Sequence, residues 1–596
     1  MIRRIFSLLA TLYLLACTAH AFTREQYSDG VQLGWNLTTY DHTTPASPDQ
    51  NPVTLAIRYR LGIEGSGHNN ASNELNSVRS ALAQWAAIPG TKIRFEEAGY
   101  VTNATQFDPY DGQSQLIWLP FGRTVYGGSV YGNVFLPGGA YALTFLGSWN
   151  NGVITEADIV FNGSANTFYQ TDFNSTAQSG PFLESVALHE IGHLLGFNHA
   201  VLGGATMYWT QPAKVGSAAG LSADDVAAAR TLYGVTSSNA LYGTITGHIT
   251  TGGAPVFGAV VSAEDANGNM AQAVVTDATG LFTLKMLVPG NYTVRVTPLD
   301  SKTNPNQSTD TYLISGYDID VTGANFYGTA NTSFLPVSTT TLAVVAGGTV
   351  SQELSVTSTA PPFRITSTRG TLLPGALQDS RFCIQLSPGQ TGAWVGVFTP
   401  GLTTTNAVLK ITGAGLSVGP THVNLNGLRG MPLVEAEVAV AADAIPGLRS
   451  ISVTASGATA WANGFLEVKP TAPDFNFDGL DDLYQRQYFS PFTRTEAAPA
   501  SDPDGDGLTN AREYFYGTNP LDPSYRILSV SLNGSGTTVT WRSGPGHKYQ
   551  VWSQEDIAGA AWVKVGSPVT AVAEAASFLD TRPATAIRFY KVTDAP

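Results

Sequence analysis

Hydrophobic and polar residues alternate with two different periods in the first third of the chain. From Val53 to Leu61 every second residue is apolar, which predicts a strand with one buried face. The same alternation in residues 91–97 and the apolar run Gln115–Leu119 predict two further strands. Between the first two strands the apolar spacing becomes three and four residues, which predicts a helix. The apolar positions are Leu55, Ile57, Tyr59, Leu61, Ile93 and Phe95 in the strands, and Leu75, Val78, Leu82 and Trp85 in the helix.

Two more helices are predicted before residue 236, and the pattern then changes. One begins near Pro181, since proline suits the first helical turn. The other begins at Ser222, which with Asp225 has the spacing of a capping box. The Ser-Ser-Asn stretch 237–239 reads as a linker, and beyond it short alternating segments are separated by Gly, Pro and Asn-Gly turns. We therefore expect an α/β (α+β) domain followed by all-β sandwich domains.

Composition and charge agree with a multidomain, sheet-rich protein. The 596 residues are too many for one core. With 62 glycines, 33 prolines and only 13% charged residues, the chain is turn-rich but not disordered. The net charge of −14 disfavours nucleic acid as a partner.

The first 21 residues predict export. A basic start, an apolar run from Ile5 to Ala16 and the Ala19-His20-Ala21 cleavage site predict a signal peptide, with a secreted chain starting at Phe22. An alternative interpretation is a lipoprotein anchored at Cys17. No later segment reaches 18 uninterrupted apolar residues, so we expect no transmembrane span.

Residues 189–199 carry the strongest chemical signal, H-E-x-x-H-x-x-G-x-x-H. His189 and His193 lie four residues apart, so a helix places both imidazoles on one face. Gly196 can adopt the left-handed conformation that ends a helix, which lets His199 approach the same metal. Three neutral imidazoles leave a fourth zinc position open, as in catalytic sites. Glu190 lies where it can hold a water molecule beside the metal.

This motif and its surroundings resemble the metzincin metalloproteases, and the matrixin branch most closely. Met207, in Ala205-Thr206-Met207-Tyr208, is similar to the methionine turn that forms a floor beneath the metal in metzincins. The segments 185–188, 221–225 and 232–234 are also matrixin-like. Trp209 stands where astacins and serralysins have a metal-binding tyrosine, which implies that the three histidines are the only protein ligands.

The chain departs from matrixins at their second, structural zinc. No histidine occurs between His68 and His189. Residues 140–145 resemble the matrixin strand at the substrate rim, but Leu143 replaces a zinc-binding histidine there. Val160 and Asn162 stand where the family has a histidine and an aspartate. The resemblance therefore implies one zinc, not two.

Residues beyond the linker resemble binding modules of exported proteins. Residues 241–357 resemble a carboxypeptidase regulatory-like β-sandwich, 361–469 an Ig-like sandwich, and 525–596 a fibronectin III-like domain. Cys383, in the second of these, is expected to be a buried small apolar side chain.

Residues 471–523 contain two loops with the ligand spacing of calcium sites. Asp502, Asp504, Asp506, Leu508 through its carbonyl, and Glu513 fill the positions of a twelve-residue calcium loop. A weaker site is predicted at Asp474, Asn476, Asp478 and Asp482, because Gln485 replaces the bidentate glutamate. The pair resembles dockerin and thrombospondin type 3 repeats, so we expect a small helical module with one or two structural Ca²⁺ ions.

These patterns together predict a secreted, monomeric zinc endopeptidase. Its protease domain is expected at residues 22–236, followed by the downstream modules. The resemblance implies His189, His193 and His199 as zinc ligands and Glu190 as general base, acting on a protein or peptide substrate. One alternative is a multidomain cell-surface, glycan-binding or protein-binding protein whose protease domain is inert. Another is a glycan-targeting exoenzyme, suggested by the dockerin-like loops and the sandwich modules.

Overall fold

A computed structural model gives the fold of most of the chain. It divides into two compact units, residues 1–68 with 90–471, and residues 69–89 with 472–596. The structure describes residues 32–40, 48–102, 111–119, 123–126, 129–132, 141–148, 152–163, 169–173, 180–208, 219–299, 333–373, 376–380, 383–427, 430–505, 508–522, 527–543, 545–555, 561–573, 575–583 and 587–595. The predicted signal peptide, Cys17, Trp209 and Asp506 lie outside the described residues. None of the helices in the described segments is long and apolar enough to cross a membrane.

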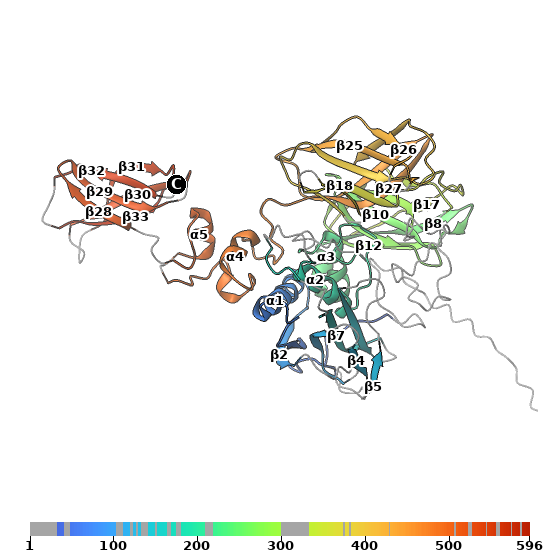
Figure 1. Ribbon diagram of the computed structural model, residues 1–596, viewed down its shortest axis with the longest axis horizontal. Coiled ribbons are helices and arrows are strands. Elements are labelled where there is room, and N and C mark those ends of the chain that lie inside the picture. The colour runs from blue at the N-terminus through green and yellow to red at the C-terminus, as the bar shows by residue number, and fades with distance from the viewer. Residues whose placement is uncertain are drawn as a thin grey trace, which may run out of the picture. The chain divides into compact units, whose positions relative to one another are not determined.

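A five-stranded sheet forms the base of the first unit. Its strands are β1 (Ile57–Gly62), β2 (Phe95–Val101), β3 (Gln115–Leu119), β6 (Ala142–Ser148) and β7 (Ile154–Asn162). The order is β2-β1-β3-β7-β6, and Figure 1 labels β2 and β7 of this sheet. The neighbouring strands β2, β1, β3 and β7 run parallel, and β6 pairs antiparallel with β7 at one edge. A separate pair of strands consists of β4 (Arg123–Tyr126) and β5 (Ser129–Gly132).

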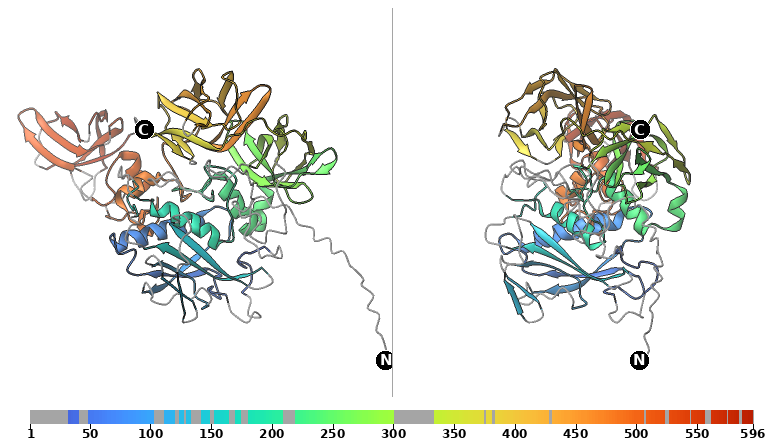
Figure 2. Two further views of the ribbon diagram at one scale, coloured as in Figure 1. Left: turned by 45° about the vertical axis from the view of Figure 1, so that its right-hand side comes forward. Right: turned by 90° about the vertical axis from the view of Figure 1, so that its right-hand side faces the viewer.

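Two helices of this unit follow the sheet in the chain. The first, α2 (Leu183–Leu194), contacts β6 and β7 (Figure 2). The second, α3 (Ala223–Tyr233), begins at the predicted capping box, in which Ser222 and Asp225 bond each other's backbone N–H. A short 3-10 helix, η1 (Thr236–Ala240), occupies the predicted linker.

Some predicted boundaries are wrong by several residues. The strand expected at 53–61 begins only at Ile57, because residues 52–54 form a turn and Leu55 has a φ of 61°. The strand expected at 91–97 begins at Phe95 and runs to Val101. The helix expected near Pro181 starts two residues later, at Leu183. The strand Gln115–Leu119 is confirmed and is buried throughout.

Residues 243–299 and 333–355 form a β-sandwich around one apolar core. One sheet has the order β11-β10-β13-β14, with β15 also on β13, and the other has the order β12-β8-β16, with β9 and β17 also on β8. Ile245, Val261, Phe282, Val294 and Phe334 are among the buried residues between the sheets. The strands are β8 (Gly243–Thr251), β9 (Ala254–Pro255), β10 (Ala259–Asp265), β11 (Met270–Val275), β12 (Leu281–Leu287), β13 (Gly290–Pro298), β14 (Val337–Ser338), β15 (Leu342–Val344), β16 (Thr349–Ser351) and β17 (Leu354–Ser355).

The described residues between 367 and 468 form a second sandwich. One sheet has the order β19-β18-β21-β25-β23, with β24 also on β25, and the other has the order β20-β27-β26-β22. Cys383, just before β20, is buried, as predicted. The strands are β18 (Ser367–Leu373), β19 (Ala376–Ser380), β20 (Ile384–Leu386), β21 (Ala393–Phe398), β22 (Ala407–Ile411), β23 (Leu416–Val418), β24 (His422–Asn424), β25 (Leu433–Val440), β26 (Gly447–Ala455) and β27 (Ala458–Val468).

The loop after α2 contacts the second sandwich. Its Gly203 N–H donates to the Asn463 carbonyl over 3.1 Å. The Tyr208 ring meets the Phe465 ring edge to face, with 5.4 Å between the centroids. A Cβ on Gly204 would lie 2.3 Å from Leu448 Cδ2 and 3.0 Å from the Cys383 sulfur. Only glycine therefore fits at position 204 without displacing the sandwich.

The second unit contains the helix α1 (Ala71–Ala87), the region of the predicted calcium loops and a last β-sandwich. The Asn70 side chain caps α1, and Asn76 donates to the carbonyl and hydroxyl oxygens of Ser490. Residues 482–516 form α4 (Asp482–Tyr488), η4 (Thr495–Ala497) and α5 (Asn510–Tyr516). The sandwich has sheets β28-β29-β32 and β31-β30-β33. Its strands are β28 (Ile527–Asn533), β29 (Gly536–Arg542), β30 (Lys548–Gln554), β31 (Val563–Thr570), β32 (Ala575–Asp580) and β33 (Phe589–Asp594).

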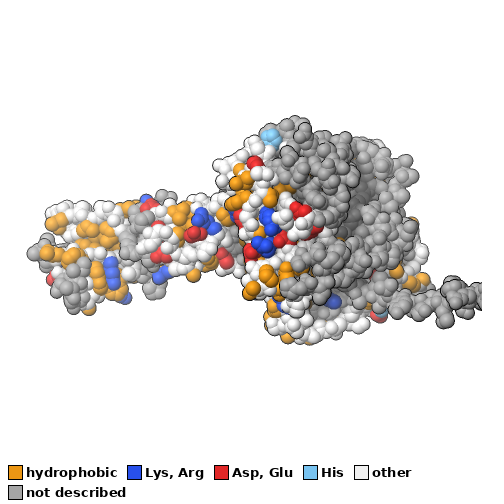
Figure 3. Space-filling view, turned by 90° about the horizontal axis from the view of Figure 1, so that it is seen from below, with side chains coloured by type: hydrophobic (Ala, Val, Ile, Leu, Met, Phe, Trp, Pro, Cys, Tyr) orange, Lys and Arg blue, Asp and Glu red, His pale blue; other side chains and the backbone are white. Residues whose placement is uncertain are grey.

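The surface of this last sandwich carries apolar side chains (Figure 3). Along the edge strand β28, Leu528, Val530 and Leu532 alternate with polar residues and are 49%, 50% and 68% exposed. Three large apolar side chains at alternate positions of one edge strand form a surface suited to contact with another molecule.

The tight contact at Gly204 predicts the effect of one added methyl group. We expect Gly204→Ala to lower the free energy of unfolding by about 1–3 kcal/mol, as overpacking does in other cores. Gly290→Ala is the matched control, since a Cβ there meets nothing closer than 3.8 Å. Thermal unfolding of the full chain measures the change in stability of each variant relative to the wild type. Equal melting of Gly204→Ala and the wild type would contradict the contact with the second sandwich.

Candidate metal centre and active site

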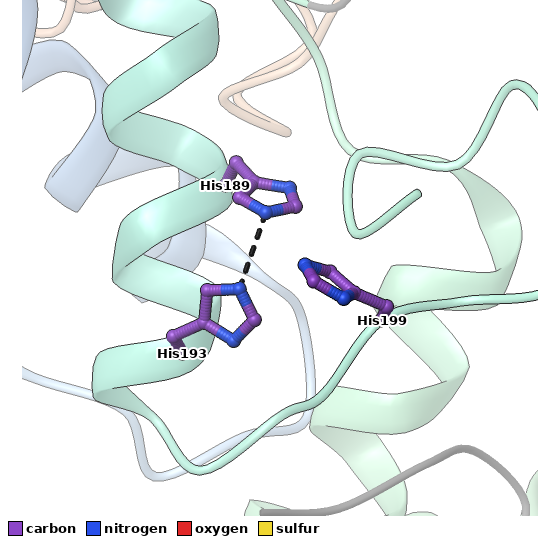
Figure 4. A group of neighbouring side chains, drawn as sticks. All are labelled: His189, His193 and His199. Carbon is purple, nitrogen blue, oxygen red and sulfur yellow. Dashed lines mark hydrogen bonds between the residues drawn. The ribbon is translucent and has the colours of Figure 1, made fainter. Parts of the chain in front are cut away.

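The end of α2 and the turn that follows bring three histidines together. His189 and His193 project from α2, and Gly196 follows at a φ of 88°. A Cβ on Gly196 would lie 2.8 Å from the Leu33 carbonyl oxygen, so both conformation and space require glycine. The chain then reverses, and His199 approaches the other two rings from the opposite side (Figure 4).

The three imidazoles have the spacing of ligands around one cation. The Nε2 atoms of His189 and His193 are 3.2 Å apart. Two nitrogens at tetrahedral positions on one zinc would be about 3.3 Å apart, given Zn–N bonds of about 2.0–2.1 Å. The ligand nitrogens of all three histidines lie within 4.8 Å of one another. Among the described residues, these histidines are the one group of three or more His, Cys, Asp or Glu side chains that could hold a metal ion.

Backbone carbonyls orient two of the rings. The Nδ1 atoms of His189 and His193 lie 2.8 Å from the Thr206 carbonyl and 2.9 Å from the Phe197 carbonyl. A carbonyl only accepts, so each Nδ1 donates and each Nε2 is left with a lone pair for a metal. Burial, and secondarily the nearby His193, lowers the pKa of His189 to about 3. The His189 ring is therefore neutral at pH 7, as a ligand must be.

Glu190 is buried beside the histidines and bonded to the edge strand of the sheet. The Thr144 hydroxyl on β6 donates to Glu190 Oε2 over 2.6 Å and also lies 3.1 Å from the Glu190 carbonyl oxygen. Burial raises the pKa of Glu190, and the neighbouring His193 and the Thr144 hydroxyl partly offset that rise. Sequence patterns gave no sign of this bond, since the partners are 46 residues apart.

The Asp225 carboxylate ties the segment containing Met207 to the start of α3. It accepts from the backbone N–H groups of Thr206 and Met207 over 2.9 and 3.2 Å, and from the N–H and hydroxyl of Ser222. Met207 is buried, and its carbonyl accepts from the Ala200 N–H next to His199. One buried carboxylate thus fixes Thr206, whose carbonyl orients His189. The capping box was predicted, but its link to Met207 was not.

Two aromatic residues satisfy the last carbonyls of α2. The Trp35 indole donates to the Leu194 carbonyl over 2.8 Å, and the Tyr233 hydroxyl donates to the Leu195 carbonyl. The Tyr233 hydroxyl in turn accepts from the backbone N–H of Trp35 over 3.2 Å. Both carbonyls lie at a helix end, where no intrahelical donor remains. Trp35 was missed in the sequence, because a single tryptophan 159 residues from its partner leaves no spacing signal.

Apolar packing occupies the positions where the resemblance would place a second zinc. Leu143 packs with Val160, Ile117 and Leu119 in one apolar cluster. Neither Leu143 nor Val160 offers a metal-binding atom. This donor set does not fit a second zinc.

Hydrogen bonds within the loop engage the four predicted ligands of the weaker calcium loop. Asp474 accepts from the N–H groups of Asp478 and Gly479, and Asp482 accepts from the Phe475 N–H. The Asn476 and Gln485 amides donate to the Asp478 carboxylate over 3.0 and 2.7 Å. Gln485 therefore supplies a hydrogen-bond donor where a calcium loop has its bidentate carboxylate.

The second calcium loop is described in part. Asp502 accepts from the Gly505 N–H over 2.9 Å, and Leu508 is partly buried. Glu513, on α5, is fully buried and accepts from the Thr518 hydroxyl. Burial raises the pKa of Tyr484, and the charges of Glu513, Tyr488 and Asp504 raise it further. The Glu513 and Asp504 carboxylates therefore both lie near the Tyr484 ring.

Comparisons with known proteins find three family models along the chain. Matrixin matches residues 39–234, the carboxypeptidase regulatory-like domain matches 244–322, and the bacterial TSP3 repeat matches 502–523. No curated protein matches the chain.

Solved structures with similarity to parts of the chain include the major pilin subunit BcpA of Bacillus cereus, at 11% identity and a TM-score of 0.13, covering 59% of this chain and 87% of that one. A titin fragment is 9% identical with a TM-score of 0.11, covering 38% of this chain and 97% of that one. Similarities this low carry no argument about fold or function.

The matrixin match contains the helix, the glycine turn and all three clustered histidines. Residues 39–234 are therefore a matrixin domain of the metallopeptidase class, and the chain continues with a carboxypeptidase regulatory-like domain and a bacterial TSP3 repeat.

Proposed function

We propose that the protein is a zinc-dependent endopeptidase that hydrolyses peptide bonds with Glu190 as general base. The observation that carries this proposal is the cluster of three histidines with a buried carboxylate beside it, inside a matrixin domain. His189, His193 and His199 would hold the metal, since their nitrogens are spaced for one cation. Met207 would form the buried floor of the site.

The chain's own residues account for the proton transfers. Zinc held there would lower the pKa of water and polarise the scissile carbonyl. Glu190 would accept the proton of the attacking water and deliver it to the leaving amine. The carbonyls of Thr206 and Phe197 hold two imidazoles in the tautomer that binds metal, so these two ligands need no change of tautomer.

The edge strand β6 would align the substrate. It pairs with β7 on one side and ends the sheet order of the described strands. An extended peptide can add to such an edge through backbone hydrogen bonds. Residues of the peptide would then pass beside Glu190, because Thr144 of β6 is bonded to that side chain.

Calcium is proposed as a structural ion of the second unit. The bacterial TSP3 match covers Asp502, Asp504, Asp506, Leu508 and Glu513. Carboxylates at this spacing suit Ca²⁺, whereas zinc prefers nitrogen and sulfur. The first loop would bind more weakly, since the Gln485 amide already bonds Asp478.

Export is proposed from residues 1–21, either as a secreted monomer starting at Phe22 or as a lipoprotein anchored at Cys17. The enzyme would then act on extracellular proteins.

A second candidate is a binding protein that acts through its last sandwich. The exposed apolar side chains of β28 favour it, since monomeric proteins seldom expose such rows. Both roles can exist in one chain. Digestion of a generic protein substrate, with and without a chelator, tests for the peptidase role.

Replacing the proposed base should separate metal binding from turnover. In Glu190→Gln the three histidines remain, so we expect a full zinc content. We expect kcat to fall roughly 10²-fold or more, because a general base contributes that much. Metal analysis and peptide hydrolysis measure the two quantities. Near wild-type turnover by a zinc-loaded Glu190→Gln protein would overturn the assigned role.

Calcium should stabilise the second unit through the second loop. A calcium ion that binds only the folded form raises the free energy of unfolding by about 2.7 kcal/mol when its concentration is a hundredfold above Kd. We expect Glu513→Ala to abolish most of the calcium-dependent shift in Tm of the full chain, and Asp482→Ala to remove less of it. Calcium titrations of thermal unfolding measure the shift in each variant. If a chelator leaves the melting of the wild-type chain unchanged, the calcium assignment of both loops is wrong.

A further inference from the structure

We infer that Thr144 is a positioning residue for Glu190 and that it couples the substrate-binding strand to the general base. This inference rests on the proposed peptidase function. The Thr144 hydroxyl lies 2.6 Å from Glu190 Oε2, a short distance typical of a hydroxyl that donates to a carboxylate.

The side-chain alternation of β6 explains why a hydroxyl is informative here. Leu143 and Phe145 pack into the apolar cluster with Val160, on the face opposite to Thr144. Thr144 therefore points towards α2, which contacts β6. An aliphatic side chain would fill a half-buried position against a helix equally well. Threonine adds one group, a hydroxyl, and its partner is the carboxylate proposed as the base.

The bond restricts the carboxylate in a useful way. Glu190 is 7% exposed, and a hydrogen bond to a charged group in such surroundings is stronger than in water. The same hydroxyl lies 3.1 Å from the Glu190 backbone carbonyl, so Thr144 contacts both ends of the residue. Oε2 is held by Thr144, and Oε1 remains as the acceptor for the proton of the attacking water.

The location of Thr144 also links substrate binding to the base. Its backbone belongs to the edge strand on which an extended peptide would add, and its side chain reaches Glu190. A peptide paired with β6 restrains the strand, and the restrained strand holds the carboxylate in one orientation. Thr144 should therefore act mainly on kcat, because it orients a group used after the peptide is bound.

The test compares one substitution that keeps the size of the side chain with one that keeps its hydroxyl. Thr144→Val keeps the volume and removes the hydroxyl, whereas Thr144→Ser keeps the hydroxyl. We expect Thr144→Val to lower kcat about 10- to 100-fold with KM little changed, which corresponds to the usual worth of a hydrogen bond to a charged group. Thr144→Ser should retain most of the wild-type kcat. Zinc content should equal that of the wild type in both.

A double-mutant cycle with Glu190→Gln shows whether Thr144 acts through Glu190. In the metal-free full chain, the change in Tm of Thr144→Val/Glu190→Gln should differ from the sum of the two single changes. In peptide hydrolysis, the kcat of the double variant should be close to the kcat of Glu190→Gln alone. Additive changes in Tm, or a kcat of Thr144→Val equal to that of the wild type, would overturn the inference.

The two proposals fail differently. If the wild type hydrolyses no peptide, the proposed function is wrong, and if Glu190→Gln retains full activity, the general-base role of Glu190 is wrong. If Glu190→Gln is inactive and Thr144→Val is fully active, only the role of Thr144 is wrong.

Discussion

The candidate centre depends on one backbone turn. Gly196 has a φ of 88°, and the Leu33 carbonyl lies where a Cβ would be. If the helix continued past this point, His199 would rotate away from His189 and His193, since a helix returns to the same face only every three to four residues. The turn therefore converts a two-histidine helix face into a three-sided cluster. Trp35 and Tyr233 support it by bonding the carbonyls of Leu194 and Leu195, which the ended helix leaves without intrahelical donors.

Much of this centre could be predicted because its geometry is local. Helix spacing fixes His189, Glu190 and His193, and glycine is the residue that suits the turn before His199. The capping box of Ser222 and Asp225 is also a pattern of four consecutive residues, and it is confirmed. Strand boundaries were predicted less well. The alternation at Val53–Leu61 continues through residues that the structure places in a turn, because periodicity does not register the φ of 61° at Leu55.

The supporting contacts could not be predicted, because they join distant segments. Thr144 meets Glu190 across 46 residues, and Trp35 meets Leu194 across 159. Neither pair has a spacing rule that a sequence could display. Asp225 is an intermediate case, since its local role in the capping box was visible but its bonds to Thr206 and Met207 were not. Residues that orient ligands thus come from the tertiary fold, whereas the ligands themselves come from one short segment.

The contact between the loop after α2 and the second sandwich extends the same argument beyond the matrixin domain. Thr206, whose carbonyl orients His189, lies between Gly204, packed against Leu448 and Cys383, and Tyr208, packed against Phe465. Asp225 holds Thr206 from the protease side, and the sandwich holds its neighbours from the other. Interiors this closely packed transmit strain, so a shift of the sandwich would displace the backbone at Thr206. The second sandwich is therefore part of what keeps the His189 imidazole in place, and the structural support of the histidine cluster extends beyond the segment that carries its motif.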